Sequence, residues 1–279
     1  AERNPRIVYG AVRGFGDPRT GDSPYSAWPC LDVAAQSFGG VVNANGELSN
    51  VAIADIYPGT LLALGLVSAV YNAKQTGQGQ FFDVAMYDAM LAMLQTNVAA
   101  YGFTGKVLPE GAPRKRVLVP FGLYPASDGR VAIAAPQPNH WEALCQAMDR
   151  ADLLTDDRTR SNGRRVRNAD FTDAQIAAWT SQHSKAQVVQ MLGGKVPVGP
   201  ANNMEEINSD PHTAAREMIK RFQLPGDNPQ AAVAGNPIKF SATPTGFYQA
   251  PPQLGEHTDA ILAEFGLSRS EPKNAEDSS

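Results

Sequence analysis

The residue of this sequence with the clearest chemical potential is Asp55, a carboxylate that stands between two apolar segments. The run before it, residues 51–54, is strand-like, and the stretch at 60–74 predicts a helix buried nearly all round. A strand-to-helix junction is where α/β folds present reactive groups, beside free N–H groups at the helix start. Aspartate is equally favoured just before a helix, and Pro58 suits the first turn. From spacing alone, a reactive carboxylate and an ordinary helix cap both remain open.

The other polar candidates favour structural roles. Asp83 and Asp88 flank a second expected strand–helix junction, where we expect them to cap the helix or face solvent. Glu256 and His257 are adjacent, but they precede a short helix in a proline-rich segment, which favours a cap over an acid–base pair. The glycine turn at 76–79 lacks the third glycine and the preceding strand of a dinucleotide-binding fingerprint, so it is a weak phosphate site.

Strand-like and helical segments alternate along residues 1–100, which predicts an α/β fold for this part of the chain. We assign these residues to a segment of a large domain that contains Asp55. Strands are expected at 7–12 and 81–85, and helices at 32–38, 60–74 and 87–99.

A second, smaller α+β domain is predicted at 118–184, after a linker at 101–117 that is rich in Gly, Pro and basic residues. A β-hairpin that turns at Asp128-Gly129 marks its start. Residues 185–279 are expected to return to the large domain and to end in a polar C-terminal tail. Other expected elements are helices at 139–148, 170–182, 205–221 (interrupted at Asp210-Pro211) and 258–265, and a strand at 239–241.

Composition sets the broad class. The chain has 279 residues, of which 43% are hydrophobic and 19% charged, with a formal net charge of −4. It is long enough to bury a sizeable core and too apolar for a disordered chain. The absence of a basic excess argues against a nucleic-acid partner. Short basic runs at 114–116 and 164–167 are expected to be solvated faces, with phosphate binding as the alternative.

Targeting and metal signals are missing. The longest apolar stretch, 61–71, is expected to be too short to span a bilayer, and no signal-peptide pattern opens the chain. Cys30 and Cys145 are too few and too far apart for a disulfide framework or a cysteine zinc site. The four histidines are scattered without metal-ligand spacing. We therefore expect a cytoplasmic protein with no metal and no membrane partner.

A series of short motifs runs through nearly the whole chain, each weak alone but specific in order and spacing. They are Asn4-Pro5-Arg6-Ile7-Val8-Tyr9, Gly14-Phe15-Gly16, Asp32-Val33-Ala34-Ala35-Gln36, Ala54-Asp55, the segment 76–86, Tyr124 with Asp128-Gly129, the segment 196–201, Asp210-Pro211-His212 and Leu254-Gly255-Glu256-His257-Thr258. Through these motifs the sequence resembles the class III CoA-transferases, the CaiB/BaiF family.

The resemblance implies part of a Rossmann-like large domain plus a smaller α+β domain, in chains that interlock as a homodimer. It also implies that Asp55 is the nucleophile, attacking an acyl-CoA to form an aspartyl-CoA thioester before coenzyme A passes to a free carboxylic acid. Met86 aligns with a family position near the CoA, although core packing explains a methionine there equally well. The family uses no metal in this reaction.

The chain also departs from the family pattern. It begins without methionine and resembles the later part of such an enzyme, so we expect an N-terminal nucleotide-binding half to be missing. Leu31 stands where the family's racemases place a histidine, which counts against isomerisation. No glycine-rich run precedes the small domain, which counts against oxalate and formate as substrates. The alternatives to a CoA-transferase are a 2-methylacyl-CoA racemase-type isomerase and a non-catalytic fragment that needs an N-terminal half.

Overall fold

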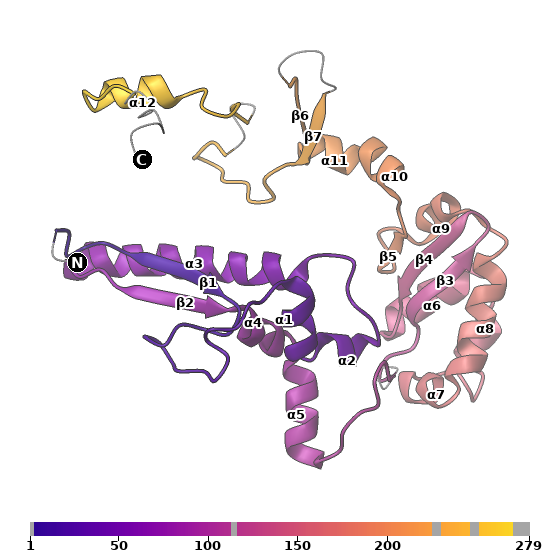
Figure 1. The fold of residues 1–279 in the computed structure, drawn as a ribbon. Coiled ribbons are helices and arrows are strands. Elements are labelled where there is room, and N and C mark those ends of the chain that lie inside the picture. The colour runs from indigo at the N-terminus through magenta and orange to yellow at the C-terminus, as the bar shows by residue number, and fades with distance from the viewer. Residues whose placement is uncertain (1–2, 113–115, 225–229, 246–250, 270–279) are drawn as a thin grey trace, which may run out of the picture. The chain divides into compact units, whose positions relative to one another are not determined.

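The computed structural model describes residues 3–112, 116–224, 230–245 and 251–269. The chain divides into two compact units, Ala1–Lys115 (unit 1) and Arg116–Ser279 (unit 2) (Figure 1). The division falls within the predicted linker at 101–117, whose first residues continue a helix as far as Thr104. Residues 114 and 115 of the first basic run lie outside the described residues.

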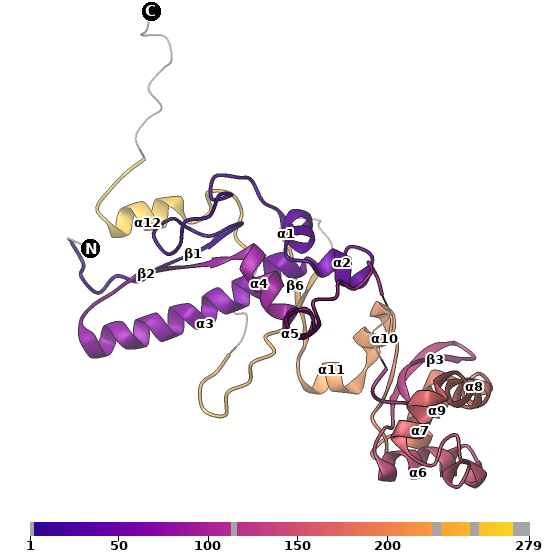
Figure 2. The ribbon, with the colours of Figure 1, turned by 90° about the horizontal axis from the view of Figure 1, so that it is seen from below.

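Unit 1 is built on a parallel pair of strands, β1 (Tyr9–Arg13) and β2 (Phe81–Ala85), paired along their whole length. Parallel strands need a long crossover connection, and helix α3 (Ile53–Thr76) lies along both of them in both ribbon views (Figures 1 and 2). The helix approaches the sheet closely because Gly65 has no side chain: a Cβ there would lie 2.4 Å from the Phe82 ring. The predicted α/β class is confirmed.

Shorter helices surround the start of α3. The predicted bounds of the first helix (32–38) and of the strand at 81–85 agree with the structure, whereas the predicted helix at 87–99 is two helices that meet at Leu94. Helices α1 and α4 both pack against α3. The helices of this group are α1 (Asp32–Phe38), α2 (Val41–Asn45), α4 (Met86–Met93) and α5 (Gln95–Thr104).

Helix α3 begins earlier than the sequence predicts. It includes Ile53 and Ala54, and residues 51–54 form no strand, so the expected strand-like run before Asp55 is wrong. All four residues of that run are apolar, and a short apolar run suits a buried strand and a buried helix equally well. In the structure the backbone N–H of Ala54 is bonded by a carboxylate from α1. A long-range contact therefore sets where this helix starts.

The prediction that this helix is buried nearly all round is also wrong for the chain that the structure describes. Only small or compact residues of α3 are buried, namely Ala54, Pro58, Ala69 and Ala73. Leu64, Val67 and Tyr71 are 65%, 70% and 67% exposed. Two strands and two short helices cover one side of α3 and leave its other side exposed. Because both sides of α3 are apolar, the sequence pattern cannot show which side is buried.

By length and composition, the 24 residues of α3 could cross a bilayer, which corrects the expectation drawn from the shorter apolar stretch at 61–71. Core helices of soluble proteins pass the same test. Here the helix packs along β1, β2, α1 and α4, as the crossover helix of an α/β layer does.

Unit 2 contains an antiparallel sheet in the order β3–β4–β5. β3 (Phe121–Ala126) and β4 (Gly129–Ala134) form the hairpin that Asp128-Gly129 predicts. β5 (Val198–Pro200) pairs with β4, and α9 (Lys185–Leu192) packs against both of these strands. The small α+β fold therefore continues past its predicted end at 184, because a strand distant in sequence completes its sheet.

The core of this fold lies between the sheet and its helices. The predicted helices at 139–148 and 170–182 are present within two residues of their expected ends. The elements around the sheet are α6 (Pro138–Ala147), the 3₁₀ helix η1 (Ala151–Leu154), α7 (Asn162–Arg167) and α8 (Ala169–Thr180). Fully buried apolar side chains include Val131, Ile133, Leu144, Leu153, Ile176, Val188 and Leu192.

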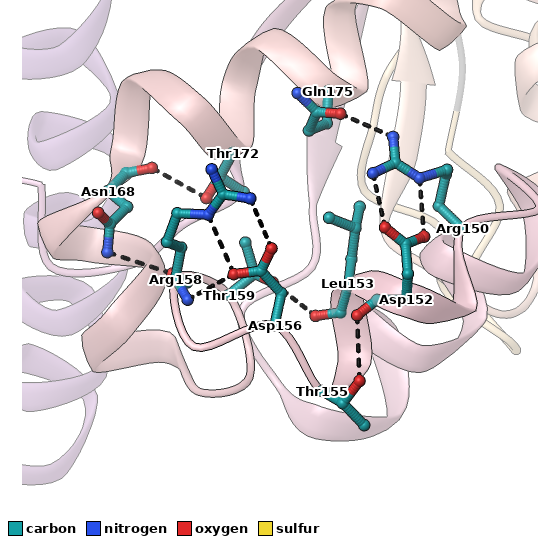
Figure 3. Close-up of polar contacts among 10 residues, drawn as sticks. All are labelled: Arg150, Asp152, Leu153, Thr155, Asp156, Arg158, Thr159, Asn168, Thr172 and Gln175. Carbon is teal, nitrogen blue, oxygen red and sulfur yellow. Dashed lines mark hydrogen bonds and ion pairs between the residues drawn. The ribbon is translucent and has the colours of Figure 1, made fainter.

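Two arginine–aspartate pairs fasten the turns between α6 and α7 (Figure 3). Arg150 donates to both carboxylate oxygens of Asp152, at 2.8 and 2.7 Å, and Arg158 donates to both of Asp156, at 3.0 and 2.7 Å. The side chain and backbone N–H of Arg158 lower the pKa of Asp156 to about 2. The Arg158 guanidinium also lies 3.6 Å from the centre of the Phe171 ring.

The basic run in α7 is not wholly a solvated face, since Arg165 is only 2% exposed. Its Nε donates to the carbonyl of Val119 at 2.7 Å, Nη1 to that of Thr159 at 2.9 Å, and Nη2 to that of Pro136 at 2.7 Å. One guanidinium thus joins three separate backbone segments. The expectation of solvent exposure is wrong here because only the folded chain brings those carbonyls together.

Tyr124 in β3 is 4% exposed, and its hydroxyl donates to Oδ1 of Asp173 at 2.7 Å. Burial, and then the bond to Asp173, raises the pKa of Tyr124 above its ordinary value of 10.0. The unfolded chain loses this proton at a lower pH than the folded chain does. The contribution to stability is therefore fully present below about pH 10 and is lost as the pH rises further.

We expect Tyr124→Phe to lower the free energy of unfolding by about 1 kcal/mol at pH 7, since one hydrogen bond is lost. We also expect the variant to lose less stability than the wild type between about pH 10 and 11, because it lacks this titrating group. Urea denaturation across that range measures both effects. A variant whose stability falls as steeply as that of the wild type would contradict the prediction.

Beyond the sheet, unit 2 continues as short elements. The predicted helix at 205–221 does break at Asp210, whose carboxylate accepts the N–H of His212 at 2.7 Å, but its last residues form a strand. The predicted strand at 239–241 is absent from the described residues. The elements are α10 (Met204–Ser209), α11 (Pro211–Ala215), β6 (Ile219–Phe222), β7 (Ala231–Ala234) and α12 (Thr258–Glu264), with β6 and β7 antiparallel.

Candidate active site

Asp55 is the third residue of α3, and its side chain is exposed. No ion pair or side-chain hydrogen bond joins its carboxylate to another residue within the described ranges. Two effects raise the pKa of the Cys30 thiol: first its burial, and second the negative charge of Asp55. An exposed carboxylate without a bonding partner is free to react.

Asp55 is not the cap of its helix. The N-cap position is Ala52, whose methyl group cannot accept a hydrogen bond. The cap is supplied by Asp32 of α1, whose Oδ1 accepts the N–H of Ala54 at 2.9 Å. The structural alternative left open by the sequence, that Asp55 is an ordinary cap, therefore does not hold in this fold.

The N–H groups at the start of α3 are not free, contrary to expectation. The N–H of Ile53 donates to the carbonyl of Val51 at 2.6 Å, that of Ala54 to Asp32, and that of Asp55 to the carbonyl of Ala52 at 3.2 Å. An oxyanion that forms next to Asp55 therefore needs hydrogen-bond donors from outside this turn.

Sequence reasoning missed the roles of Asp32 and Gln36, although both belong to a motif that it singled out. Asp32 Oδ2 accepts from Nε2 of Gln36 at 2.7 Å, and Oε1 of Gln36 accepts the backbone N–H of Ser49 at 2.9 Å. Gln36 is fully buried. The available signal was a polar residue on the apolar side of a short helix, one turn after an aspartate.

Met86, predicted to lie near coenzyme A, is 7% exposed. It belongs to the hydrophobic cluster beneath the first turn of α3, together with Ala35, Val41, Ala54, Ala89 and Met90. This packing accounts for an apolar residue at position 86. A contact between Met86 and coenzyme A stays a prediction.

Three other carboxylates of unit 1, those of Asp22, Asp83 and Asp88, line a separate cavity of about 460 Å³. Asp83 accepts the N–H of Asp17 at 2.9 Å and a short bond from the hydroxyl of Thr20, so it holds the loop after β1 and does not cap α4 or face solvent as we expected. Asp88 lines the same cavity, and burial followed by the charge of Asp83 raises its pKa.

Leu31 and the histidines bear on the alternative chemistries. Leu31 is 75% exposed and directly precedes Asp32, in the same unit as Asp55. All four histidines of the sequence fall in unit 2. Glu256 accepts the N–H of Gln253 at 2.6 Å, a local turn contact. Among the residues that the structure describes, no cluster of three or more His, Cys, Asp or Glu side chains could hold a metal ion.

The fold and the site define an α/β protein with an exposed carboxylate, which has no bonding partner among the described residues, at the start of its crossover helix. A family model described as "CoA-transferase family III" matches residues 1–258. The chain therefore belongs to CoA-transferase family III, a family of enzymes that transfer coenzyme A between carboxylic acids, and the resemblance to the CaiB/BaiF proteins is confirmed.

Known relatives agree with this assignment. The chain is 36% identical over 272 residues to the succinyl-CoA:mesaconate CoA-transferase of Haloarcula marismortui, covering 95% of this chain and 68% of that protein. It is 30% identical over 279 residues to the acetyl-CoA:oxalate CoA-transferase of Acetobacter aceti, with the same coverages of 95% and 68%. A crystal structure of a CaiB/BaiF family protein from Brucella suis is similar with a TM-score of 0.77 and 27% identity, covering 94% of this chain and 68% of that one.

Proposed function

We propose that Asp55 is the nucleophile with which this enzyme moves coenzyme A from an acyl-CoA to a free carboxylic acid. The observation that supports this is the exposed carboxylate of Asp55, which has no bonding partner among the described residues and does not cap its own helix. A carboxylate is nucleophilic when ionised and forms acyl intermediates that a thiolate can cleave.

In the first half-reaction, a carboxylate oxygen of Asp55 attacks the thioester carbonyl of the donor. The carbon–sulfur bond breaks, which yields a mixed anhydride and a CoA thiolate. The thiolate then attacks the carbonyl of the aspartyl group and the anhydride carbon–oxygen bond breaks. The first acid leaves as a carboxylate, and Asp55 holds coenzyme A as a thioester.

In the second half-reaction, the carboxylate of the acceptor acid attacks the aspartyl thioester and displaces the CoA thiolate. The thiolate attacks the acceptor's acyl carbon in the new anhydride, which forms the product thioester and restores the Asp55 carboxylate. One carboxylate enters and one leaves, so no proton or external energy source is consumed. The protein must stabilise the oxyanions and exclude water from the anhydride.

A covalent intermediate is the direct test of this mechanism. Mixing the full-length protein with an acyl-CoA in the absence of an acceptor should add the mass of coenzyme A less one water to the peptide that contains Asp55, and hydroxylamine should convert that residue to a hydroxamate. An enzyme that leaves Asp55 unmodified, and instead exchanges the α-proton of the acyl group for deuterium, would be a racemase-type isomerase.

For the substrates, we propose succinyl-CoA as the donor and a dicarboxylic acid such as mesaconate as the acceptor. The 36% identity to a succinyl-CoA:mesaconate CoA-transferase supports this pair. The 30% identical relative is named for acetyl-CoA and oxalate, but this chain lacks the glycine-rich run expected for oxalate. Residues other than Asp55 must set the preference for one acid pair, because Asp55 reacts with the carbonyl group that all these substrates share.

We expect kcat/KM for succinyl-CoA and mesaconate to exceed that for acetyl-CoA and oxalate by at least about tenfold, the scale at which a binding pocket separates acids of different length. A panel of acyl-CoA donors and acids, followed by chromatography of the CoA esters, measures this. Equal or reversed preference would overturn the substrate assignment while leaving CoA transfer intact.

We also propose that the enzyme is a cytoplasmic homodimer. The exposed apolar side of α3, with Leu64, Val67 and Tyr71, supports contact with further protein, and the free Cys30 and Cys145 fit a reducing compartment. Sedimentation equilibrium of the full-length protein tests the oligomeric state, and cell fractionation tests the location. A monomer that remains active at nanomolar concentration would contradict the dimer.

A further inference from the structure

The start of α3 depends on a side chain from elsewhere in the chain. Ala52, at the N-cap, offers no acceptor, so the N–H of Ala54 would lack a partner within its own helix. Asp32 supplies that partner at 2.9 Å across 22 residues of sequence. The next residue along the helix is Asp55. The backbone that carries the proposed nucleophile is thus fixed by a carboxylate of α1.

Asp32 is itself held in place. Its second oxygen accepts from Nε2 of Gln36, one helical turn further along α1, at 2.7 Å. Oε1 of Gln36 accepts the N–H of Ser49 at 2.9 Å, and Nε2 also lies 3.4 Å from the Ser49 carbonyl. Because Gln36 is fully buried, it has no water to replace these partners.

The two side chains therefore tie both ends of one segment to the same helix. Residue 49 is bound through Gln36 and residue 54 through Asp32, so the segment between them cannot shift without breaking a partly buried hydrogen bond.

We propose that Asp32 and Gln36 are positioning residues that hold the carboxylate of Asp55 in the geometry needed to attack a thioester. This inference rests on the proposed function of Asp55. Covalent catalysis requires the attacking oxygen to meet the carbonyl carbon at close range and in the right direction, and a displacement of about 1 Å can cost about 10²-fold in rate. A shift of the first turn of α3 displaces Asp55 directly.

The bonding pattern provides a test by exchange. Asp32→Asn keeps an acceptor for Ala54 but turns an NH₂ group towards the NH₂ of Gln36; if the Gln36 amide turns over, it opposes the N–H of Ser49 instead. Gln36→Glu places two carboxylates against each other. The double variant D32N/Q36E restores a donor and an acceptor at the contacts with the Ala54 N–H, between residues 32 and 36, and with the Ser49 N–H, with the net charge unchanged. Only the long 3.4 Å contact to the Ser49 carbonyl is not restored.

We expect each single variant to lower the first-order rate constant for formation of the Asp55 adduct by about 10- to 100-fold, with little change in KM, and the double variant to recover most of the loss. The rate constant, measured by rapid quenching and intact mass, is independent of how much of the sample is folded. A purely structural role would lower the amplitude and the thermal midpoint but leave this constant unchanged. Ser37→Ala, an exposed change on the same helix, serves as the control.

Single variants that react at the wild-type rate, or a double variant no faster than the single ones, would overturn the inference. Its failure is separable from failure of the proposed function. If Asp55 forms the adduct at the same rate in all variants, Asp55 is still supported as the nucleophile, but Asp32 and Gln36 do not position it. If no adduct forms on Asp55 even in the wild type, the proposed mechanism falls first.

Discussion

Asp55→Asn is expected to lower kcat for CoA transfer by at least about 10⁴-fold, because an amide oxygen cannot form the anhydride on which both half-reactions depend. The two side chains have nearly the same shape. Since the Asp55 carboxylate is exposed and unpaired among the described residues, the free energy of unfolding of the variant should lie within about 0.5 kcal/mol of the wild-type value. Steady-state transfer and urea denaturation measure the two quantities separately.

The matched control is Glu47→Gln, which removes another exposed carboxylate in the loop before α3. We expect it to retain wild-type transfer, so that a loss in the Asp55 variant cannot be attributed to net charge. Intact mass spectrometry after incubation with acyl-CoA should show the CoA adduct in the control and in the wild type only. Transfer above about a hundredth of the wild-type rate in Asp55→Asn would rule out Asp55 as the nucleophile.

Arg165→Leu is expected to lower the stability of the small α+β fold by about 3 kcal/mol or more. The guanidinium of Arg165 donates to three carbonyls, and each buried acceptor that loses its donor costs about 1–3 kcal/mol. Leucine leaves all three acceptors without a partner. The cost should appear in the denaturant midpoint, and unit 2 should become more sensitive to proteolysis before unit 1 does.

Two further variants separate the causes. Arg165→Lys keeps the positive charge, but the single ammonium nitrogen of lysine cannot donate to all three carbonyls that surround the planar guanidinium. We therefore expect the lysine variant to recover less than half of the stability that the leucine variant loses. Arg167→Leu changes an exposed arginine of the same helix and should alter stability by no more than about 0.5 kcal/mol. If Arg165→Leu is as mild as Arg167→Leu, the carbonyl cluster has another source of hydrogen bonds.

Elements defined by neighbouring residues were predicted well from the sequence. The hairpin at Asp128-Gly129, the strand at 81–85 and the helix at 32–38 all depend on turn chemistry or on a periodicity that only a few consecutive residues establish. The same local logic fails at residues 51–54, where a short apolar run that suits a strand contains the start of a helix at Ile53.

The candidate site shows the same division. The sequence singled out Asp55 by its position and by its family motif, yet it left open whether that carboxylate was a cap. The cap proved to be Asp32, and the residue that orients it, Gln36, shows only that it is a polar residue on the apolar side of a short helix, which does not identify its partners. Neither contact follows from spacing, because each joins segments that only packing brings together.

By itself, the amino-acid sequence determined the α/β class, the family, most element positions and the identity of the candidate nucleophile, since motifs and short-range periodicity encode these. The tertiary structure alone decided where α3 begins, which carboxylate caps it, that Arg165 is buried and that β5 completes the small sheet. The physical reason is that hydrogen bonds and burial between residues far apart in the chain depend on how the segments pack, and local pattern contains no record of that packing.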